Sequence, residues 1–473
     1  MEKSILFAAI IFLTCCGSPI SDDVTPTFST LTGCTDSYAI NTVNDVAFSD
    51  NSCEYTPISC EECDFVLAAD KVIIDNDDLS LPIGSVICLG SGVRRSVIIR
   101  NFHGTSETPY IFTNCDGQSI VDEDLPGIKL HYSSHIRLTG TGSTDEYGIK
   151  VIQGRPFGVV AELGTTDFEI DHLDISGATE VAIAARTRPV CDGSTNKDTF
   201  TQRNTIIHHN YLHDVGGEGT YVGGSHWHSS FPAGASDCPD QTLYEPELKG
   251  VRIYNNIVEN TGKDGIQVGN GIEDCKIFNN IITNYGLQNI TIHQAGIMVN
   301  PGTTGEIFSN VVKGGTGNGI FVNGFDNLIY SNLVIDCKKN AIHVGDREPL
   351  PGKSYRIVNN SLINIEGNAL YMNSKLSANN IFYNNLMANI QSDAINKLGS
   401  DIDLDLSNNI ISSSLDNIAL ENIGQLNFTP TSTSPLLDSG RVIDRDQLFV
   451  DLLMRERKSG EAIDVGAFEF QQE

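Results

Sequence analysis

The feature that most constrains the fold is a short asparagine motif that recurs through the second half of the chain. The motif is I-x-N-N-I with variants, and successive copies stand 22 to 30 residues apart. A repeat of this length, with two or three short strands in each copy, is typical of a solenoid whose coils stack on one another. The second Asn falls at Asn256, Asn280, Asn310, Asn332, Asn360, Asn385 and Asn409, with Asn210 before these and His172 in the position one step earlier.

A second landmark follows eight residues after this asparagine. It is an acid or an Asn, then a small residue and an apolar strand, as in Asp264-Gly-Ile-Gln-Val-Gly. Alternate residues such as Ile266 and Val268 are expected to point into the coil, because side chains alternate along a strand. The same position holds Glu180, Glu218, Asn318, Asn340, Asn368 and Asp393.

The two landmarks together predict an all-β fold, a single-stranded right-handed parallel β-helix with long loops on the central coils. We expect it to occupy residues 63–473, including a closing segment at the C-terminus. The repeated Asn is expected to bond its amide to neighbouring coils and so form a ladder. A leucine-rich repeat is excluded because its leucine frame and its helices are missing, and sandwiches or propellers would show hairpin Asn-Gly turns at shorter spacing.

The N-terminus indicates export. One Lys precedes the apolar run Ile5–Leu13, which is too short for a mature membrane span. The run ends in Leu-Thr-Cys-Cys-Gly, which resembles a bacterial lipoprotein signal. We therefore predict a signal peptide over residues 1–16 with lipidation of Cys16, followed by a tether and N-terminal cap over residues 17–62. This implies an outer-membrane lipoprotein, periplasmic or at the cell surface, held to the membrane by a lipid anchor. An ordinary cleaved signal, which would make the protein extracellular, is the alternative.

Charge and cysteine content narrow the class further. The net charge of −30 argues against nucleic-acid binding and means that a polyanionic substrate would need a local basic site or bridging cations. Ten cysteines follow the signal, and an even number in an exported chain suggests disulfides. We predict one pair, Cys191 with Cys238, because their two insertions leave adjacent coils at matching points.

Both ends of the predicted helix carry motifs of a known group. Ser434-Pro-Leu-Leu-Asp-Ser-Gly and Asp464-Val-Gly-Ala-Phe-Glu resemble the closing segment of secreted β-helix lipoproteins of the Bacteroidetes type. Asn101-Phe-His-Gly-Thr and Pro109-Tyr-Ile-Phe resemble their opening coils. The resemblance implies export and a β-helix. Because that group includes polysaccharide lyases, uronate epimerases, hydrolases and proteins without known activity, it leaves the reaction open.

Three acids are the main candidates for chemistry. Equivalent residues on adjacent coils lie ~4.8 Å apart, so Glu180, Glu218 and Asp264 are expected to form a column. Carboxylates this close raise one another's pKa or require a cation between them, and calcium would suit oxygen ligands. Alternatively, the position simply favours a turn-capping side chain, since the later coils carry Asn there.

Long insertions border this column and supply further candidates. We expect His226, His228, Tyr221 and Lys249 to act with Glu218 and Asp264 in catalysis, and Trp227, which lies between the two histidines, to stack on a sugar ring. The alternatives for the histidines are a zinc site or an exposed loop without a role. The remaining substrate-binding candidates are Arg186, Arg188, Gln267, His293 and Asn300. The outward column Met298, Phe321, His343 and Tyr371 either binds polymer or is covered by the C-terminal segment, and we expect Phe321 to be covered.

Three functions fit these features. The first is a polysaccharide lyase or C5-epimerase acting on uronate-containing glycans, which needs a neutralised carboxylate, a base and a proton donor. The second is a glycoside hydrolase that pairs Glu218 with Asp264 or Glu180. The third is a surface protein that binds glycans without catalysis. Calcium is the one cofactor that the acidic column suggests, and polysaccharide is the expected partner.

Overall fold

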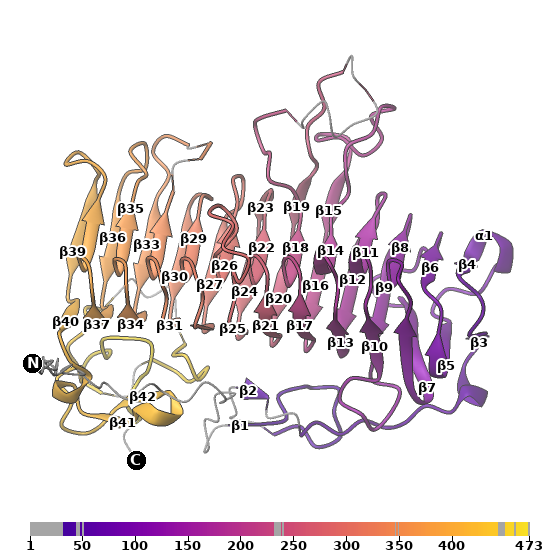
Figure 1. Ribbon diagram of the computed structural model, residues 1–473, viewed down its shortest axis with the longest axis horizontal. Helices are drawn as coiled ribbons and strands as arrows, with labels where there is room; N and C mark the ends of the chain where they lie inside the picture. Colours follow the sequence, from indigo (N-terminus) through magenta and orange to yellow (C-terminus); the bar gives the residue numbers. More distant parts are fainter. Residues whose placement is uncertain are drawn as a thin grey trace, which may run out of the picture.

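The computed structural model describes residues 32–43, 48–49, 52–230, 238, 241–345, 347–348, 350–442, 450–457 and 460–471. The predicted lipidation site Cys16 and residues 17–31 of the predicted tether and cap lie outside these residues. The described chain is a right-handed parallel β-helix, as predicted. Figure 1 shows its coils side by side along the long axis, with the central loops projecting at one edge. Within the described residues, no helix has the length and apolarity needed to span a bilayer.

Each coil between residues 128 and 397 contributes one strand to each of three columns. Column 1 holds β9 (Ser134–Thr139), β12 (Thr166–Asp171), β16 (Thr205–His208), β20 (Arg252–Tyr254), β24 (Cys275–Phe278), β27 (Gly305–Phe308), β30 (Asn327–Tyr330), β33 (Tyr355–Val358), β36 (Asn380–Tyr383) and β39 (Leu404–Ser407). Column 2 holds β10 (Ile149–Ile152), β13 (Leu173–Ser176), β17 (Tyr211–Val215), β21 (Ile257–Thr261), β25 (Ile281–Thr283), β28 (Val311–Lys313), β31 (Leu333–Ile335), β34 (Ser361–Ile365), β37 (Leu386–Ile390) and β40 (Ile410–Ser412).

Column 3 is the sheet that carries the candidate site. It holds β4 (Ile73–Asp75), β6 (Val97–Arg100), β8 (Ile128–His131), β11 (Phe157–Glu162), β14 (Val181–Ala185), β18 (Thr220–Val222), β22 (Ile266–Val268), β26 (Ile297–Val299), β29 (Ile320–Val322), β32 (Ile342–Val344), β35 (Leu370–Met372) and β38 (Ile395–Lys397). All of its neighbouring strands pair in parallel. Inward residues such as Ile266 and Val268 are fully buried and belong to one continuous core.

The remaining elements open, border or close the helix. The first coils use β3 (Phe65–Leu67), β5 (Val86–Arg94) and β7 (Tyr110–Asp122), with a short α1 (Asn76–Leu79) beside them. The insertions pair as a small parallel sheet of β15 (Thr201–Arg203), β19 (Glu247–Lys249) and β23 (Gly271–Glu273). Short elements complete the ends: β1 (Thr32–Gly33), β2 (Phe48–Ser49), η1 (Cys60–Glu62), η3 (Leu415–Asn417), β41 (Leu420–Asn422), η4 (Ile423–Gln425) and β42 (Asn427–Pro430).

The asparagine ladder forms as predicted. The side-chain N–H of Asn256 donates to Oδ1 of Asn280 at 3.0 Å, and that of Asn310 donates to Oδ1 of Asn332 at 2.9 Å. The residue before each ladder Asn has a left-handed backbone, with φ of 53° at Asn255, which explains the doubled Asn because Asn tolerates this conformation better than most residues.

One assignment of the repeat was wrong by one residue. His172 has the left-handed φ of 57° that Asn255 has, and its N–H donates to the carbonyl of His209. The ladder position of this coil is therefore Leu173, whose N–H donates to Oδ1 of Asn210. Since Ile183 pairs with Thr220, Glu180 lies opposite Gly217 and not opposite Glu218. Glu218 and Asp264 are in register, because Thr220 pairs with Ile266.

The N-terminal residues lie along the flank of the helix rather than over its end. Figure 1 shows β1 and β2 beneath the ends of column 2, whereas α1 and β4 stand at the first coil. We call described residues 32–62 the N-terminal strap. Tyr55 Oη lies 2.6 Å from His172 Nε2, and the N–H of Ile58 donates to the Gly142 carbonyl. The strap is therefore held by a buried polar cluster of adjacent coils.

The C-terminal segment packs on the outward side of column 2. Leu436, Leu452, Val465 and Phe468 form one apolar cluster with column-2 residues such as Leu333 and Leu386. The expectation that this segment covers Phe321 was therefore wrong, because Phe321 lies on column 3 and lines the cavity described below.

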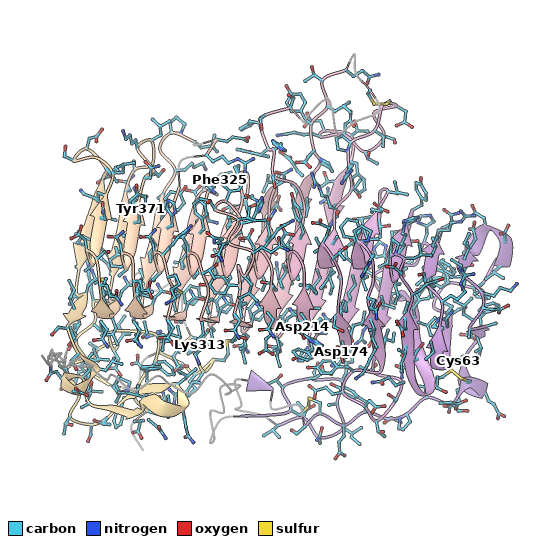
Figure 2. The ribbon with its side chains drawn as sticks, viewed as in Figure 1. Cys63, Asp174, Asp214, Lys313, Phe325 and Tyr371 are labelled. Carbon is cyan, nitrogen blue, oxygen red and sulfur yellow. A yellow bond between two sulfur atoms is a disulfide. The ribbon has the colours of Figure 1, made fainter. Side chains whose placement is uncertain are left out.

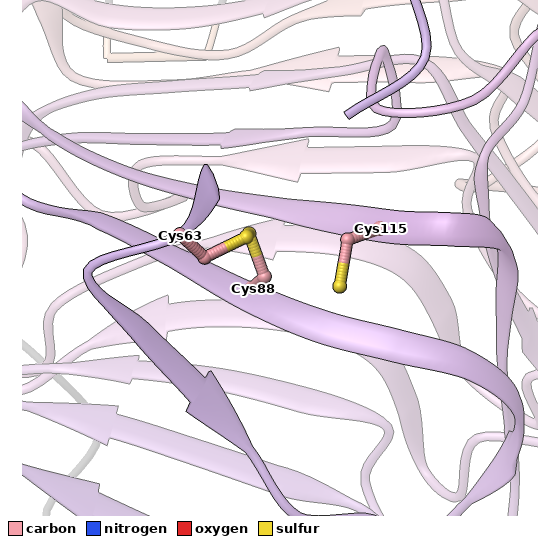
Figure 3. Close-up of side chains that lie close together, drawn as sticks. All are labelled: Cys63, Cys88 and Cys115. Carbon is pink, nitrogen blue, oxygen red and sulfur yellow. A yellow bond between two sulfur atoms is a disulfide. The ribbon is translucent and has the colours of Figure 1, made fainter. Parts of the chain in front are cut away.

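Four disulfides join the described cysteines. Cys191 pairs with Cys238 as predicted, with their Cα atoms 5.5 Å apart. The others are Cys34–Cys53, Cys60–Cys115 and Cys63–Cys88. Figure 3 shows the Cys63–Cys88 bond with Cys115 close by, so this gathering of sulfurs consists of disulfides and is not a metal site. Cys275 and Cys337 are buried free thiols.

Candidate active site

A cavity of about 900 Å³ opens on the outward side of column 3, at the central loops. Its floor is one row of outward residues in register on successive coils, namely Val160, Ala184, Tyr221, Gln267, Met298 and Phe321. The insertions form its walls with Arg186, Arg188, Ser225, His226, Ile292, His293, Asn300, Asn323 and Arg347. The sequence analysis predicted seven of these residues for the site, namely Arg186, Arg188, Tyr221, His226, Gln267, His293 and Asn300.

Glu218 stands at one edge of the cavity between Lys263 and His293. Its side chain is 4% exposed, with Lys263 Nζ at 3.7 Å and His293 Nδ1 at 3.8 Å. Its own backbone N–H also bonds to the carboxylate. Burial raises the pKa of Glu218, and the nearby Lys263 only partly offsets this effect. A buried carboxyl that lines a cavity and has a raised pKa is suited to exchange a proton with a ligand there.

Asp264 lies beside Glu218, but both of its carboxylate oxygens already have partners. Its Oδ1 accepts the N–H of Ala295 at 2.6 Å, and its Oδ2 lies 3.3 Å from His293 Nδ1. The side chain has no exposed surface. Burial raises the pKa of Asp264, while the hydrogen bond to Asp264 is the main reason that the pKa of His293 is raised. Asp264 thus supports a turn and raises the pKa of His293.

Glu180 reaches the same group of charges through Lys263. Lys263 Nζ lies 2.9 Å from Glu180, whose side chain is 52% exposed. Burial alone would lower the pKa of Lys263, but Glu180 and Glu218 outweigh it and raise the pKa. The three predicted acids do meet, although through a lysine and a histidine and not as the straight column that we expected.

Calcium does not fit this group of residues. Glu218, Asp264 and His293 bring three ligand atoms within 4.8 Å of one another. Calcium takes six to eight oxygen ligands, whereas one donor here is an imidazole nitrogen and one Asp264 oxygen is already taken by Ala295. Lys263 adds a positive charge at the same place, so the negative charge is balanced by side chains.

Tyr221 lies in the middle of the floor with its hydroxyl held from the loop side. Its Oη lies 2.7 Å from Ser225 Oγ, which also lies 3.3 Å from Asn300 Nδ2 and 3.4 Å from Gln267 Nε2. Gln267 is 1% exposed, and its Oε1 has no hydrogen-bond partner in the described residues. The floor therefore offers a hydroxyl and an unsatisfied buried acceptor, which suits a hydroxyl-rich ligand.

A buried carboxylate organises the loop above Tyr221. Glu245 is 1% exposed and accepts the N–H groups of Ser225 and His226, each at 2.9 Å. It also pairs with Arg186, whose guanidinium lies over the Tyr221 ring at 5.1 Å. Burial alone would lower the pKa of Arg186, but Tyr221 and Glu245 outweigh it and raise the pKa. The exposed Arg188 and Arg347 complete a cationic wall.

Besides Asp264, three predicted residues lie outside the cavity lining. Trp227 is 8% exposed and packs against Phe325 and Gly302, with its ring N–H donating to Glu247. His228 leans on Trp227, and its backbone N–H donates to Glu348 at 2.8 Å. Lys249 pairs with Glu273 in the small sheet of the insertions. The structure thus places these side chains in the framework of the loop.

Sequence reasoning missed several residues that the fold brings together. The cavity is lined or supported by Lys263, Ser225, Glu245 and Arg347. Of these, only Lys263 could have been found from the repeat, because it directly precedes Asp264. The buried cluster of Asp36, Asp171, His172 and His209 on the opposite flank was also missed. His172 and His209 each precede a ladder position, so in the sequence they looked like ordinary turn residues.

Comparison with known proteins supports the fold. A family model described as the right handed beta helix region matches residues 200–387. No curated protein matches. The A-module of the mannuronan C-5 epimerase AlgE4 of Azotobacter vinelandii is 12% identical, with a TM-score of 0.45, and the match covers 74% of this chain and 96% of that one. The PL6 family polysaccharide lyase Pedsa3628 of Pseudopedobacter saltans is 11% identical, with a TM-score of 0.39 and coverage of 72% and 92%.

A third structure is similar over more of this chain. The pectate lyase Pel9A is 12% identical, with a TM-score of 0.39, and the match covers 88% of this chain and 98% of that one. At these identities and scores, the activity of a neighbouring structure does not transfer to this chain, so the reaction must be argued from the cavity itself.

Proposed function

We propose that this protein is an exported polysaccharide lyase or C5-epimerase that acts on uronate-containing glycans. The observation that carries the proposal is the meeting of Glu218, Tyr221 and an arginine wall in one cavity of about 900 Å³. Both reactions begin with removal of the proton at C5 of a uronate. They need a cation at the carboxylate, a base and a proton donor, and the cavity offers each of these groups.

The cationic wall is suited to the substrate carboxylate. Arg188 and Arg347 line the cavity and are exposed, so each can pair with an incoming anion. Neutralising the carboxylate stabilises the negative charge that develops when the C5 proton leaves. A neutral sugar would offer these guanidinium groups no charge to pair with. This local basic wall also answers how a chain with a net charge of −30 could hold a polyanion.

Glu218 and Tyr221 are suited to the two proton transfers. A carboxylate whose pKa is raised by burial is a stronger base, so ionised Glu218 would take the C5 proton. In a lyase, the electron pair of the C5–H bond forms the C4–C5 double bond, the C4–oxygen bond breaks, and Tyr221 gives its proton to the leaving oxygen. In an epimerase, Tyr221 gives that proton to C5 from the opposite face.

A hydrolase is the second candidate, because Lys263 bridges Glu218 and the accessible Glu180. Asp264 is not suited to be the partner of Glu218, since both of its oxygens are engaged and it has no exposed surface. A hydrolase would add water across the glycosidic bond and leave no double bond.

The test is incubation of the protein with polymannuronate, polygalacturonate and glycosaminoglycans in D₂O. A lyase gives ultraviolet absorbance from the unsaturated product, and an epimerase incorporates deuterium at C5, seen by NMR. Tyr221→Phe should abolish either signal. Tyr383→Phe, which removes a hydrogen-bonded hydroxyl on column 1, should leave it unchanged. New reducing ends without unsaturation would establish the hydrolase, and binding without any product would establish a glycan-binding protein.

A further inference from the structure

The floor of the cavity continues past its edge as a row of aromatic rings. Phe321 lines the cavity, and His343 and Tyr371 follow it in register on the next two coils. The Phe321 and His343 rings are stacked, with centroids 4.2 Å apart and planes 7° from parallel. His343 and Tyr371 meet edge to face at 4.9 Å. We call these three side chains the aromatic track.

The track is partly open to solvent. All three side chains are of intermediate burial. Burial, helped by Lys339, lowers the pKa of His343 to about 4, so the imidazole behaves as a neutral ring. The described C-terminal segment packs on column 2 and leaves this side of column 3 uncovered. Figure 2 marks Tyr371 near the end of this row, several coils beyond the central loops.

We propose that Phe321, His343 and Tyr371 are sugar-binding subsites that lead a uronate polymer from the cavity toward the C-terminal coils. The inference rests on the proposed function of the cavity. Phe321 and His343 each cover one face of the other, so they offer ring edges to a sugar, whereas the Tyr371 ring stands at 85° to His343. Rigid aromatic side chains lose little entropy when they pack against the apolar faces of sugar rings. The occupant must be a chain, because the track is continuous with the cavity floor through the pairing of Met298 with Phe321.

The geometry sets the direction and the length dependence of binding. Successive rings lie one coil apart, ~4.8 Å, so the polymer would cross the strands at a steep angle. A short oligosaccharide fills only the cavity, whereas a longer one also covers His343 and Tyr371. Binding should therefore strengthen with chain length until the track is filled.

The test is calorimetric titration of the full chain with a trisaccharide and an octasaccharide of mannuronate and of galacturonate. Tyr371→Ala should weaken octasaccharide binding by about threefold to tenfold and leave trisaccharide binding unchanged. Phe278→Ala is the matched control, because Phe278 is an outward, stacked, half-buried ring on column 1. It should leave both affinities unchanged.

The outcomes separate the track from the reaction. If product forms but Tyr371→Ala weakens binding of both lengths equally or of neither, the track is overturned and the proposed function stands. If no product forms while octasaccharide binding still depends on Tyr371, the track stands and the proposed reaction fails. If wild-type protein binds neither length of either uronate, the track is overturned. Circular dichroism of each variant shows whether the fold is retained.

Discussion

The backbone N–H of Ala295 donates to Oδ1 of Asp264 at 2.6 Å, and this is the bond that the N–H of Asn340 makes to Oδ1 of Asn318 two coils later. Asp264 therefore performs the turn function of the later asparagines, and Glu218 is the acid that departs from it. Of the two neighbouring carboxyl groups, Asp264 therefore has a structural role and Glu218 is left for chemistry.

Replacing Asp264 should separate its contributions. Asp264→Asn keeps an oxygen for the Ala295 N–H, so the thermal midpoint should change little. Asp264→Ala leaves that buried N–H unpaired and should cost about 1–3 kcal/mol. Thermal unfolding followed by circular dichroism measures the difference. The Asn variant should also lower the pKa of His293, measured by NMR titration, because the Asp264 hydrogen bond is its main cause. Equal midpoints for the two variants would contradict the turn role.

Replacing Glu218 should affect the reaction more than the fold. Glu218→Gln removes the proposed base at nearly constant volume and should slow product formation by about 10²–10⁴-fold. Asp393→Asn is the matched control, because Asp393 occupies the equivalent position before the last strand of column 3 and is exposed. The rate of the wild-type protein should fall as pH decreases through the pKa of Glu218, which burial places above its usual value. A Gln variant with the wild-type rate would remove Glu218 from the mechanism.

The sequence determined the coils and located the cavity, but it did not reveal the loop contacts. The Asn repeat and its eight-residue companion fix the phase of every coil from Asn210 on, and this phase placed Glu218, Tyr221 and Gln267 in one region. Leu173 is not an Asn, so the ladder position of its coil was assigned to His172, one residue too early. The same error placed Glu180 opposite Glu218 instead of opposite Gly217. Glu245 and Ser225 lie in a long insertion without periodicity, and only tertiary pairing brings them to Tyr221.

Alkaline pH should weaken the attachment of the N-terminal strap. His172 has no exposed surface; burial alone would lower its pKa, but Asp171 and Asp36 outweigh burial and raise it to about 9. The stabilisation is therefore complete below the unfolded pKa of 6.5 and is lost as pH rises through about 9. For Asp36, burial alone would raise the pKa, but His172 lowers it to about 2, so its contribution is lost only as pH falls through about 2.

The pKa shifts of His172 and Asp36 describe one ion pair but differ in size. We therefore expect the pair to contribute the stability that corresponds to the smaller shift, about 2 kcal/mol. Limited proteolysis of the strap at pH 6 and at pH 10 measures the effect. Wild-type protein should be cleaved faster at the higher pH, and His172→Gln should be cleaved fast at both. His213→Gln is the control, because His213 pairs with Asp174 and Asp214 on the same flank without contacting the strap. Figure 2 marks those two aspartates there.

The asparagine ladder should carry a large share of the stability of each coil. The side-chain N–H group of Asn310 donates to Ile277, Phe308 and Asn332, and its Oδ1 accepts from Asn280, all at 2.9–3.1 Å and all fully buried. Asn310→Ala would leave these partners without bonds and should cost about 3–5 kcal/mol. Asn417→Ala, at an exposed position in η3, should change stability by less than about 0.5 kcal/mol. Urea unfolding of both variants compares the two values. A loss at Asn310 no larger than that at Asn417 would show that the apolar core alone holds the coils in register.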